Sequence, residues 1–568
     1  MFWGVGGAVG KSADLTRIRA LPRRSPTPDP AVTADYAARL KTPAGTMTLR
    51  PLQAMALRDA FECRGLVAAL GVGEGKGLLG LLLPTVLEAR VTVLLVPAAL
   101  RYQMCDVMYP AYAPHWRLPF LAPDAEPVTD AHPEGVVHVV SYSMLSSIRF
   151  QDVLARLKPD CIVCDEAHSV ADYGAARTKR FRTYVRGARS SGVLQSLCLM
   201  SGTILSKSIT DVAPLAGLAL GSASPWPLDW NTLQEWAGAL DPGGFPANPG
   251  ALTCFRVTPT QSVLEGFRDR VTHTPGVVVS QGNTLATSLV IGTRAVRVPK
   301  AVSAVLAAAR ETWCMPDGTN IDDALTFSRH VLELACGFYY RRTWPRGESL
   351  ETQRVWLDSR SAWYREVSNY LSQSARAGCD SLALCEQSAA RGDLGWTNYV
   401  TWAQVRDTAK PDREAVWFSE FLLEDAVRWG AISPGIIWYE HDAVGRKIAE
   451  LGGHPLYDGG SVQDQEIAKE TGSRTIVASV NAHGTGKNLQ IHSRSLITSA
   501  TPSGKVWEQL IGRTHREGQQ ADAVSVAVYL HTPELVSVFE RARVNARFIQ
   551  DALGAWQRLC YASYADGH

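Results

Sequence analysis

The 568 residues are too many for one hydrophobic core, and the usual domain size predicts three or four compact units. With 46% hydrophobic and 20% charged residues, the composition is that of an ordinary globular protein, and the apolar runs end well before the ~20 residues that span a bilayer. We therefore expect no membrane segment. The net charge of +2, from 57 basic and 55 acidic residues, excludes a polycation that coats nucleic acid but leaves room for a locally basic site.

Residues 1 to 47 are rich in glycine, proline and arginine, with "LPRRSPTPDP" as the clearest breaker cluster, and they predict a partly extended N-terminal arm. The arm contains "GAVGKS", in which Gly10, Lys11 and Ser12 imitate a phosphate-binding loop. A functional loop of this type follows a buried strand, for which there is too little chain before Gly10. We assign no nucleotide site to this stretch.

From Leu49 onward, short apolar runs alternate with amphipathic stretches, which predicts a parallel sheet covered by helices on both faces. We predict a first α/β domain over residues 48 to 215 and a second one, with a C-terminal helix, over residues 431 to 568. Residues 216 to 430 combine loop-like stretches with long helical patterns. They predict a mainly helical insertion or bridging region.

The stretch "GVGEGKGLLG", Gly71 to Gly80, has the glycines and the lysine of a phosphate-binding loop between a strand-like and a helix-like run. Backbone N–H groups and the helix N-terminus would hold phosphate oxygens, while Lys76 would reach the β and γ phosphates. Gly77 stands where a magnesium-binding serine or threonine is expected. Losing that ligand costs about 1–3 kcal/mol, and we expect a water beside Gly77 to replace it, which predicts slow or magnesium-demanding hydrolysis.

In "CIVCDEAH" an apolar run ends directly in two adjacent carboxylates, Asp165 and Glu166. At a strand end one carboxylate can face Mg²⁺ and the other the attacking water, the division of labour that phosphoryl transfer requires. The two cysteines of the same run, Cys161 and Cys164, lack the second ligand pair of a zinc site, and we interpret them as core thiols. The odd total of eleven cysteines and the absence of a secretory leader predict free thiols and a cytoplasmic protein.

The second α/β pattern contains "WEQLIGRTHREGQ", with Gln509, Gly512, Arg513 and Arg516. On a helix the two arginines are three residues apart and share a face, so both guanidinium groups can point at one anion. An arginine that reaches across a domain boundary to a γ-phosphate would supply charge that the first domain lacks.

Together these motifs resemble those of superfamily-two helicases in order and rough spacing: "TLRPLQ", "GEGKG", "SYSML", "DEAH", "SGT", "GTGKNL" and "QLIGRTHREGQ". The last stretch resembles the Swi/Snf-type branch, typified by chromatin remodelers and by smaller bacterial and phage-encoded relatives. The resemblance covers about residues 48 to 215 and 431 to 530. It implies two RecA-like domains with ATP and Mg²⁺ between them, which move along nucleic acid as their cleft opens and closes.

The resemblance also implies roles for individual residues. Gln53 would read the adenine, Lys76 the phosphates, Asp165 the Mg²⁺ and Glu166 the water, with Arg513 and Arg516 as arginine fingers. The remaining nucleotide-binding positions would be Gly73, Glu74, Gly75, Gly77, Gly484 and Gln509. The positions that couple the nucleotide to the nucleic-acid groove would be His168, Ser201, Gly202, Thr203, Gly486, Lys487 and Asn488.

Two basic stretches allow more than one interpretation. "ARTKRFRTYVRGAR" has six basic residues and no acid, and it either holds phosphates of a duplex or is a solvated helix face. Its predicted nucleic-acid contacts are Arg177, Lys179 and Arg180. In "FYYRRTW", Arg341 and Arg342 lie among aromatic residues that could stack on bases, but core or interface packing is the favoured interpretation.

The first functional hypothesis is an ATP-driven nucleic-acid motor, a monomer whose DNA-stimulated hydrolysis is coupled to translocation, with duplex DNA as the expected track. RNA as the track and strand separation both stay open, because such motors grip mostly the backbone. The alternative is a nucleotide-gated DNA-binding clamp or scaffold with little or no turnover, which Gly77 alone supports. By resemblance we expect the cytoplasm of a bacterium or of a phage-infected cell.

Overall fold

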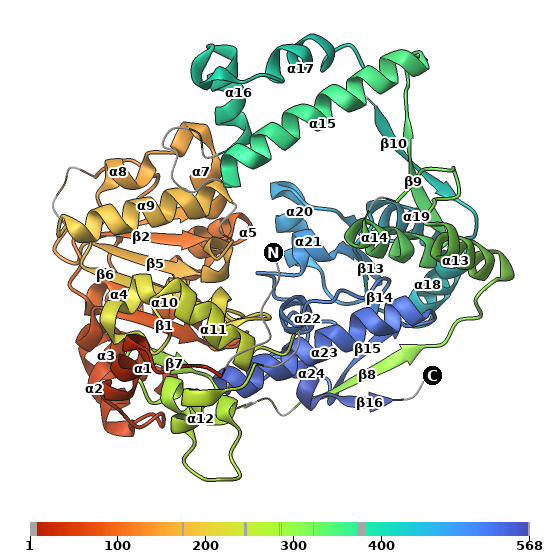
Figure 1. Ribbon diagram of the computed structural model, residues 1–568. Helices are drawn as coiled ribbons and strands as arrows, with labels where there is room; N and C mark the ends of the chain where they lie inside the picture. Colours follow the sequence, from red (N-terminus) through yellow and green to blue (C-terminus); the bar gives the residue numbers. More distant parts are fainter. Residues whose placement is uncertain are drawn as a thin grey trace.

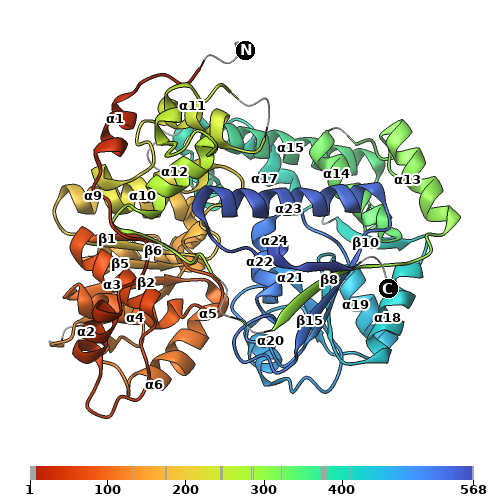
Figure 2. The ribbon, with the colours of Figure 1, turned by 90° about the horizontal axis from the view of Figure 1, so that it is seen from below.

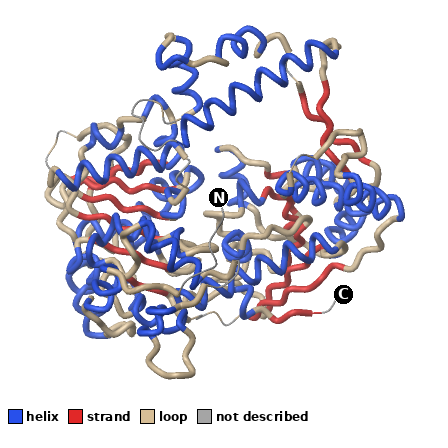
Figure 3. The backbone as a smooth tube through the Cα atoms, viewed as in Figure 1, coloured by secondary structure: helices blue, strands red, loops and turns tan. Residues whose placement is uncertain are grey.

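The computed structural model describes residues 8–565 apart from 129, 131, 173–174, 244–246, 283–284, 286, 322, 373–378, 380 and 410 (Figure 1). It contains two seven-stranded sheets, each with parallel strands throughout, and Figure 3 shows helices on both sides of each sheet. The predicted two-domain α/β fold class is confirmed.

The first sheet has the strand order β3-β4-β2-β5-β6-β1-β7 and separates two hydrophobic cores. Val67 of β1 belongs to the core that includes α9 and α10, whereas its neighbour Leu66 belongs to the core that includes α3 and α4. Because both faces are covered, the strands are continuous apolar runs. The strands are β1 (Gly65–Ala69), β2 (Val91–Val96), β3 (Phe120–Leu121), β4 (Val136–Ser141), β5 (Cys161–Asp165), β6 (Ser196–Met200) and β7 (Val277–Val279). The associated helices are α1 (Ala13–Ala20), α2 (Pro30–Leu40), α3 (Pro51–Cys63), α4 (Lys76–Val86), α5 (Ala98–Tyr102), the π-helix η1 (Gln103–Met108), α6 (Tyr109–Tyr112), α7 (Tyr142–Ser146), α8 (Val153–Leu157), α9 (Ala176–Ser190), α10 (Ala213–Leu220), α11 (Trp230–Leu240) and α12 (Val263–Thr272).

The second sheet has the strand order β12-β13-β11-β14-β15-β8-β16 and also lies between two cores. Its strands are β8 (Ser288–Arg294), β11 (Ile436–Tyr439), β12 (Leu456–Tyr457), β13 (Ile476–Ser479), β14 (Arg494–Ile497), β15 (Ala523–Tyr529) and β16 (Ser563–Ala565). Its helices are α13 (Lys300–Thr312), α14 (Ala324–Ala335), α18 (Phe421–Ile432), α19 (Asp442–Gly452), α20 (Ser461–Glu466), α21 (Val480–His483), α22 (Gly504–Ile511), α23 (Pro533–Leu553) and α24 (Arg558–Tyr561).

The predicted helical region, residues 216 to 430, contributes a strand to each sheet, which corrects its boundaries. β7 pairs with β1 at the edge of the first sheet, and β8 pairs with β15 inside the second. The first α/β unit therefore continues to β7 and the second begins at β8. Sequence patterns missed both strands because β7 has only three residues and the apolar run of β8 is limited to Leu289, Val290 and Ile291.

The N-terminal arm is more helical than its composition predicted, since α1 and α2 occupy much of residues 8 to 47. Ser12 Oγ accepts the amide N–H of Leu15 at 3.1 Å, so the serine of "GAVGKS" is a helix cap. Asp29 caps α2 in the same way, with Pro30 as the first helical residue. These local capping signals outweigh the breaker-rich composition, and residues 8–12, 21–29 and 41–47 are not helical.

α23 connects the two α/β units (Figure 2). In its first half Phe539 and Ala542 belong to a core of the second sheet, and in its second half Phe548 and Leu553 belong to a core of the first. One continuous helix therefore fixes the two units relative to each other. Neither α23 nor any other helix in the described part of the chain is long and apolar enough to cross a bilayer.

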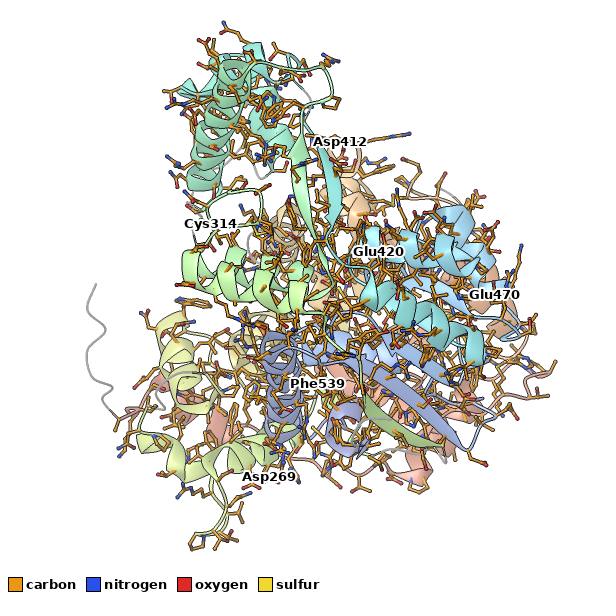
Figure 4. All side chains as sticks on the ribbon, turned by 90° about the vertical axis from the view of Figure 1, so that its right-hand side faces the viewer. Asp269, Cys314, Asp412, Glu420, Glu470 and Phe539 are labelled. Atoms are coloured by element: carbon orange, nitrogen blue, oxygen red, sulfur yellow. The ribbon has the colours of Figure 1, made fainter. Side chains whose placement is uncertain are left out.

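A small helical module projects from the second unit on an antiparallel ribbon of two strands (Figures 1 and 4). The ribbon consists of β9 (Phe338–Thr343) and β10 (Asp412–Trp417). The module has its own core, in which Trp363 is fully buried. Its helices are α15 (Leu350–Ser372), α16 (Leu382–Ala390) and α17 (Tyr399–Val405).

Candidate functional site

Three adjacent strands of the first sheet end at one edge, and a predicted motif follows each of them. In the order β5-β6-β1, Asp165 is the last residue of β5, Ser201 follows β6, and the loop from Gly71 to Gly75 follows β1. The carboxyl ends of parallel strands form the usual ligand-binding edge of an open α/β sheet. The fold therefore brings the three motifs together.

The loop before α4 has the backbone expected of a phosphate cradle. Gly75 is the N-cap of α4 and has φ +76°, and a Cβ there would lie 2.4 Å from Gln53 Nε2. Gln53 itself is 2% exposed; its Nε2 donates to the Gly75 carbonyl at 3.0 Å, and its Oε1 accepts the Arg50 amide N–H at 2.9 Å. Gln53 thus braces the loop, and contact with an adenine, its predicted role, would require these bonds to open.

Lys76 lies at the centre of the site. Its ammonium donates to the carbonyls of Leu70 at 3.0 Å and Gly71 at 3.2 Å, and it lies 3.7 Å from Glu166 Oε1. The side chain is only 11% exposed, so its charge acts in a poorly solvated environment. An anion with a higher charge density than two carbonyl groups would replace those contacts.

The space beside Gly77 is filled by a methionine, which corrects the expectation of a water there. A Cβ on Gly77 would lie 2.1 Å from Met108 Cε and 3.1 Å from its Sδ. Met108 is the last residue of the π-helix η1, which faces the start of α4. No sequence pattern predicts this contact, because it depends on how η1 packs on α4.

Asp165 and Glu166 are 5% and 8% exposed, so their charges influence each other strongly. Burial and the neighbouring Glu166 carboxylate raise the pKa of Asp165 to about 7. Burial alone would raise the pKa of Glu166 too, but Lys76, His168 and Ser201 hold it below its ordinary value. Glu166 is therefore the ionised member of the pair, and Asp165 is the member whose ionisation is disfavoured, although Lys76 partly offsets this.

The position of Asp165 is compatible with its predicted role as a ligand of Mg²⁺. One of its oxygens, Oδ1, accepts the Glu166 amide N–H at 3.1 Å, and a bound cation would add to the partial compensation that its charge receives from Lys76. In the described part of the chain, no group of three His, Cys, Asp or Glu side chains could hold a metal. A single carboxylate suits Mg²⁺, which keeps several waters and takes other oxygens from substrate phosphates.

A chain of polar contacts links Glu166 to the second α/β unit. Ser201 Oγ donates to Glu166 Oε2 at 2.8 Å and accepts the Thr203 amide N–H at 3.1 Å. Across the interface, Gln509 Nε2 donates to Thr203 Oγ1 at 3.4 Å. His168 Nδ1 lies 3.0 Å from Ser201 Oγ. Gly202 packs closely on the end of β1, since a Cβ there would lie 3.0 Å from the Leu70 carbonyl. These predicted coupling residues are in contact.

Arg513 and Arg516 follow α22 in turns and bends, not on a helix as predicted, and lie on the second unit's side of the interface. Arg513 is 5% exposed, and its guanidinium donates to the carbonyls of Gln509 at 2.8 Å and Lys487 at 3.2 Å. Burial and the charge of Arg516 lower its pKa to about 9, while Glu166 opposes this shift. Arg516 donates to Asn488 Oδ1, and burial lowers its pKa as well. Both guanidinium groups therefore donate their hydrogen bonds to backbone carbonyl or side-chain amide oxygens.

Residues of the "GTGKNL" motif hold these two arginines in place. They do not hold the loop from Gly71 to Gly75 in the first unit. Lys487 Nζ pairs with Asp464 Oδ1 at 2.7 Å, inside the second unit. Gly484 packs at the end of α21 and does not line the pocket described below. Gly486 approaches the first unit, because a Cβ there would lie 2.5 Å from Leu100 Cδ2.

The three basic residues predicted to contact nucleic acid from α9 donate instead to backbone carbonyls. Arg177 donates to Ser169 at 2.6 Å, Arg180 to Leu145 at 2.7 Å, and Lys179 to Leu371 of α15 at 2.9 Å. α9 is therefore tied to its surroundings, and Lys179 joins the first unit to the helical module.

A pocket beside the phosphate loop contains residues that the sequence did not single out. Arg50 donates to the Gly73 carbonyl at 2.6 Å and pairs with Glu517 of the second unit. Trp556, just after α23, stacks on Tyr561 at 5.5 Å with an angle of 13° between the rings. The lining residues include Arg50, Gly71, Val72, Gly73, Glu74, Gly202, Ser280, Leu285, Glu517, Trp556 and Arg558.

The pocket combines an aromatic ring, two guanidinium groups, two carboxylates and loop amides, and Arg50 pairs with Glu517 while Arg558 pairs with Glu508. Arg50 stands in "TLRPLQ" and could have been suspected from that motif, whereas no local pattern marks Trp556. No protein-family model matches this chain, and a search of curated proteins found no match.

Met108 gives a direct test of the Gly77 position. We expect the double variant Gly77→Thr, Met108→Ala to need about tenfold less Mg²⁺ for half-maximal binding of a fluorescent ATP analogue, because a hydroxyl then adds one oxygen ligand. Met108→Ala alone is the control for the enlarged space. An unchanged Mg²⁺ requirement in the double variant would show that the hydroxyl is not the missing ligand.

Proposed function

We propose that the protein hydrolyses ATP between its two α/β units and uses the hydrolysis to move along nucleic acid. The observation that carries the proposal is the position of Glu166. This ionised, buried carboxylate lies 3.7 Å from the lysine of the phosphate loop and is linked through Ser201 and Thr203 to Gln509 of the second unit. Coupling of hydrolysis to motion requires a catalytic carboxylate whose contacts change with the position of a second domain.

Each group has a place in the proposed reaction. The phosphates would replace the two carbonyl contacts of Lys76, and the ionised Glu166 would orient a water and accept its proton. Bound Mg²⁺, held through Asp165, would neutralise charge on the phosphate oxygens. Arg513 would give up its carbonyl contacts for the γ-phosphate when the units close, so that its positive charge reaches the transition state.

Nucleic acid is the proposed track, and duplex DNA is the preferred form on the basis of the Swi/Snf resemblance. In that interpretation the two units are RecA-like domains. Gly512 allows close contact between the units, because a Cβ there would lie 3.0 Å from Val72 of the first unit. α22 can therefore approach the nucleotide only because this position has no side chain.

A second candidate, a nucleotide-gated clamp with little turnover, has one observation in its favour. The thioether of Met108 lies where a metal-binding hydroxyl would otherwise project. A site that holds Mg²⁺ weakly could bind a nucleotide without hydrolysing it quickly. The clamp predicts nucleotide-dependent DNA binding without DNA-stimulated hydrolysis.

The central test compares ATP hydrolysis alone and with duplex DNA, single-stranded DNA or RNA. We expect duplex DNA to stimulate hydrolysis most strongly, and Glu166→Gln to lower the rate by about 100-fold or more, because the amide cannot accept the proton. The variant should still bind ATP, which separates a chemical defect from a folding defect. Hydrolysis that no nucleic acid stimulates would contradict the motor, and full activity in Glu166→Gln would contradict the assigned site.

Trp556 is the proposed platform for the base. We expect Trp556→Ala to raise the KM for ATP about tenfold with little change in kcat, since stacking on an aromatic ring is worth about 1–3 kcal/mol per base. Trp556→Phe keeps a ring and should restore most of the loss. An unchanged KM in Trp556→Ala would place the base elsewhere.

A further inference from the structure

The helical module and its ribbon, residues 338 to 417, have no part in the proposed hydrolysis. In the ribbon, Arg342 of β9 lies directly opposite Arg413 of β10, and both side chains are exposed. Like charges that face each other across two strands destabilise the pair. Neither arginine has an ion-pair partner among the residues that the structure describes.

The adjacent cross-strand pair shows what an ordinary pairing looks like. Arg341 faces Glu414 on the other side of the ribbon and forms an ion pair at 2.9 Å. Successive residues of a strand point to opposite faces, so one face carries a neutral pair and the other carries two positive charges. The positive charge is therefore specific to the face of Arg342.

A third arginine extends this charge onto the module. Arg360 of α15 lies over the ring of Tyr364 at 4.5 Å, and Arg413 lies over the ring of Tyr340 at 5.9 Å. The guanidinium of Arg342 is partly shielded from water, which lowers its pKa, and the charges of Arg360 and Arg413 lower it further. We call Arg342, Arg360 and Arg413 the arginine cluster. Two of its three guanidinium groups rest on aromatic rings, which orient them without neutralising them.

The ribbon and α15 together form a bridge between the two α/β units, and the cluster lies on this bridge. The ribbon joins the module to the second unit, where the Tyr340 hydroxyl accepts the Ala443 amide N–H of α19 at 3.3 Å. The far end of α15 meets the first unit through the bond from Lys179 to the Leu371 carbonyl at 2.9 Å. Figure 1 shows α15 crossing from one unit to the other.

We propose that the arginine cluster binds phosphates of the nucleic-acid backbone and gives the protein a second grip outside its two sheets. This inference rests on the proposed function. One guanidinium group can donate two parallel hydrogen bonds to two oxygens of a phosphate. A phosphate between Arg342 and Arg413 would attract both positive charges and so offset the repulsion between them. The aromatic residues of "FYYRRTW" remain packing residues, since Phe338 and Tyr339 are buried.

The test measures binding of a labelled DNA duplex by fluorescence anisotropy over a range of salt concentrations without nucleotide. We expect the double variant Arg342→Gln, Arg413→Gln to weaken binding about tenfold or more at low salt. It should also lower the slope of log affinity against log salt by about two, one unit for each lost phosphate contact. Arg341→Gln is the matched control from the opposite face and should bind like the parent protein.

A melting curve provides a check on folding. Removal of the like-charge pair should leave the melting temperature of the double variant unchanged or raise it, so weaker binding by a stable variant supports the cluster. Binding and salt slope equal to those of Arg341→Gln would overturn the inference, while DNA-stimulated hydrolysis in the same protein would leave the proposed function intact. Failure of the parent protein both to bind DNA and to respond to it would overturn both.

Discussion

The buried charge of Glu166 is the constraint around which the interface is built. A carboxylate that is 8% exposed stays ionised only if positive charge and hydrogen-bond donors surround it. Lys76 and Ser201 supply these from the first unit, and the charge of Arg513 reaches Glu166 from the second. The adjacent Asp165 receives only partial compensation, from Lys76 and from the Glu166 amide N–H, so its pKa stays raised and a bound cation would favour its ionised form.

The same constraint explains why the interface is polar but tightly packed. The contact from Gln509 to Thr203 and the approach of Gly512 to Val72 bring a helix of the second unit close to the phosphate loop. α23 then limits how far the units can separate, because its two halves are buried in different cores. Motion between the units would therefore bend or rotate about this helix rather than separate the units.

Much of the site could be predicted from sequence, because each motif is local. "GEGKG", "DEAH" and "SGT" each follow an apolar strand, and a parallel sheet brings such strand ends to one edge. What sequence could not give depends on packing between distant segments. Met108 beside Gly77, the engaged amide of Gln53 and the ring of Trp556 all follow from how separate elements meet. The two-domain α/β class was equally accessible, whereas β7, β8 and the capped helices α1 and α2 were not, because their apolar patterns are short.

The central claim is that Lys76 of one unit and Arg513 of the other act on the same triphosphate. The most direct measurement is the single-turnover rate of ATP hydrolysis for Lys76→Ala, Arg513→Ala and the double variant, with ATP saturating. The account predicts that each single change lowers the rate by about 1000-fold or more and that the double variant is little worse than either, because both groups stabilise one transition state. Hydrolysis at the parent rate by Arg513→Ala would contradict a nucleotide held between the two units.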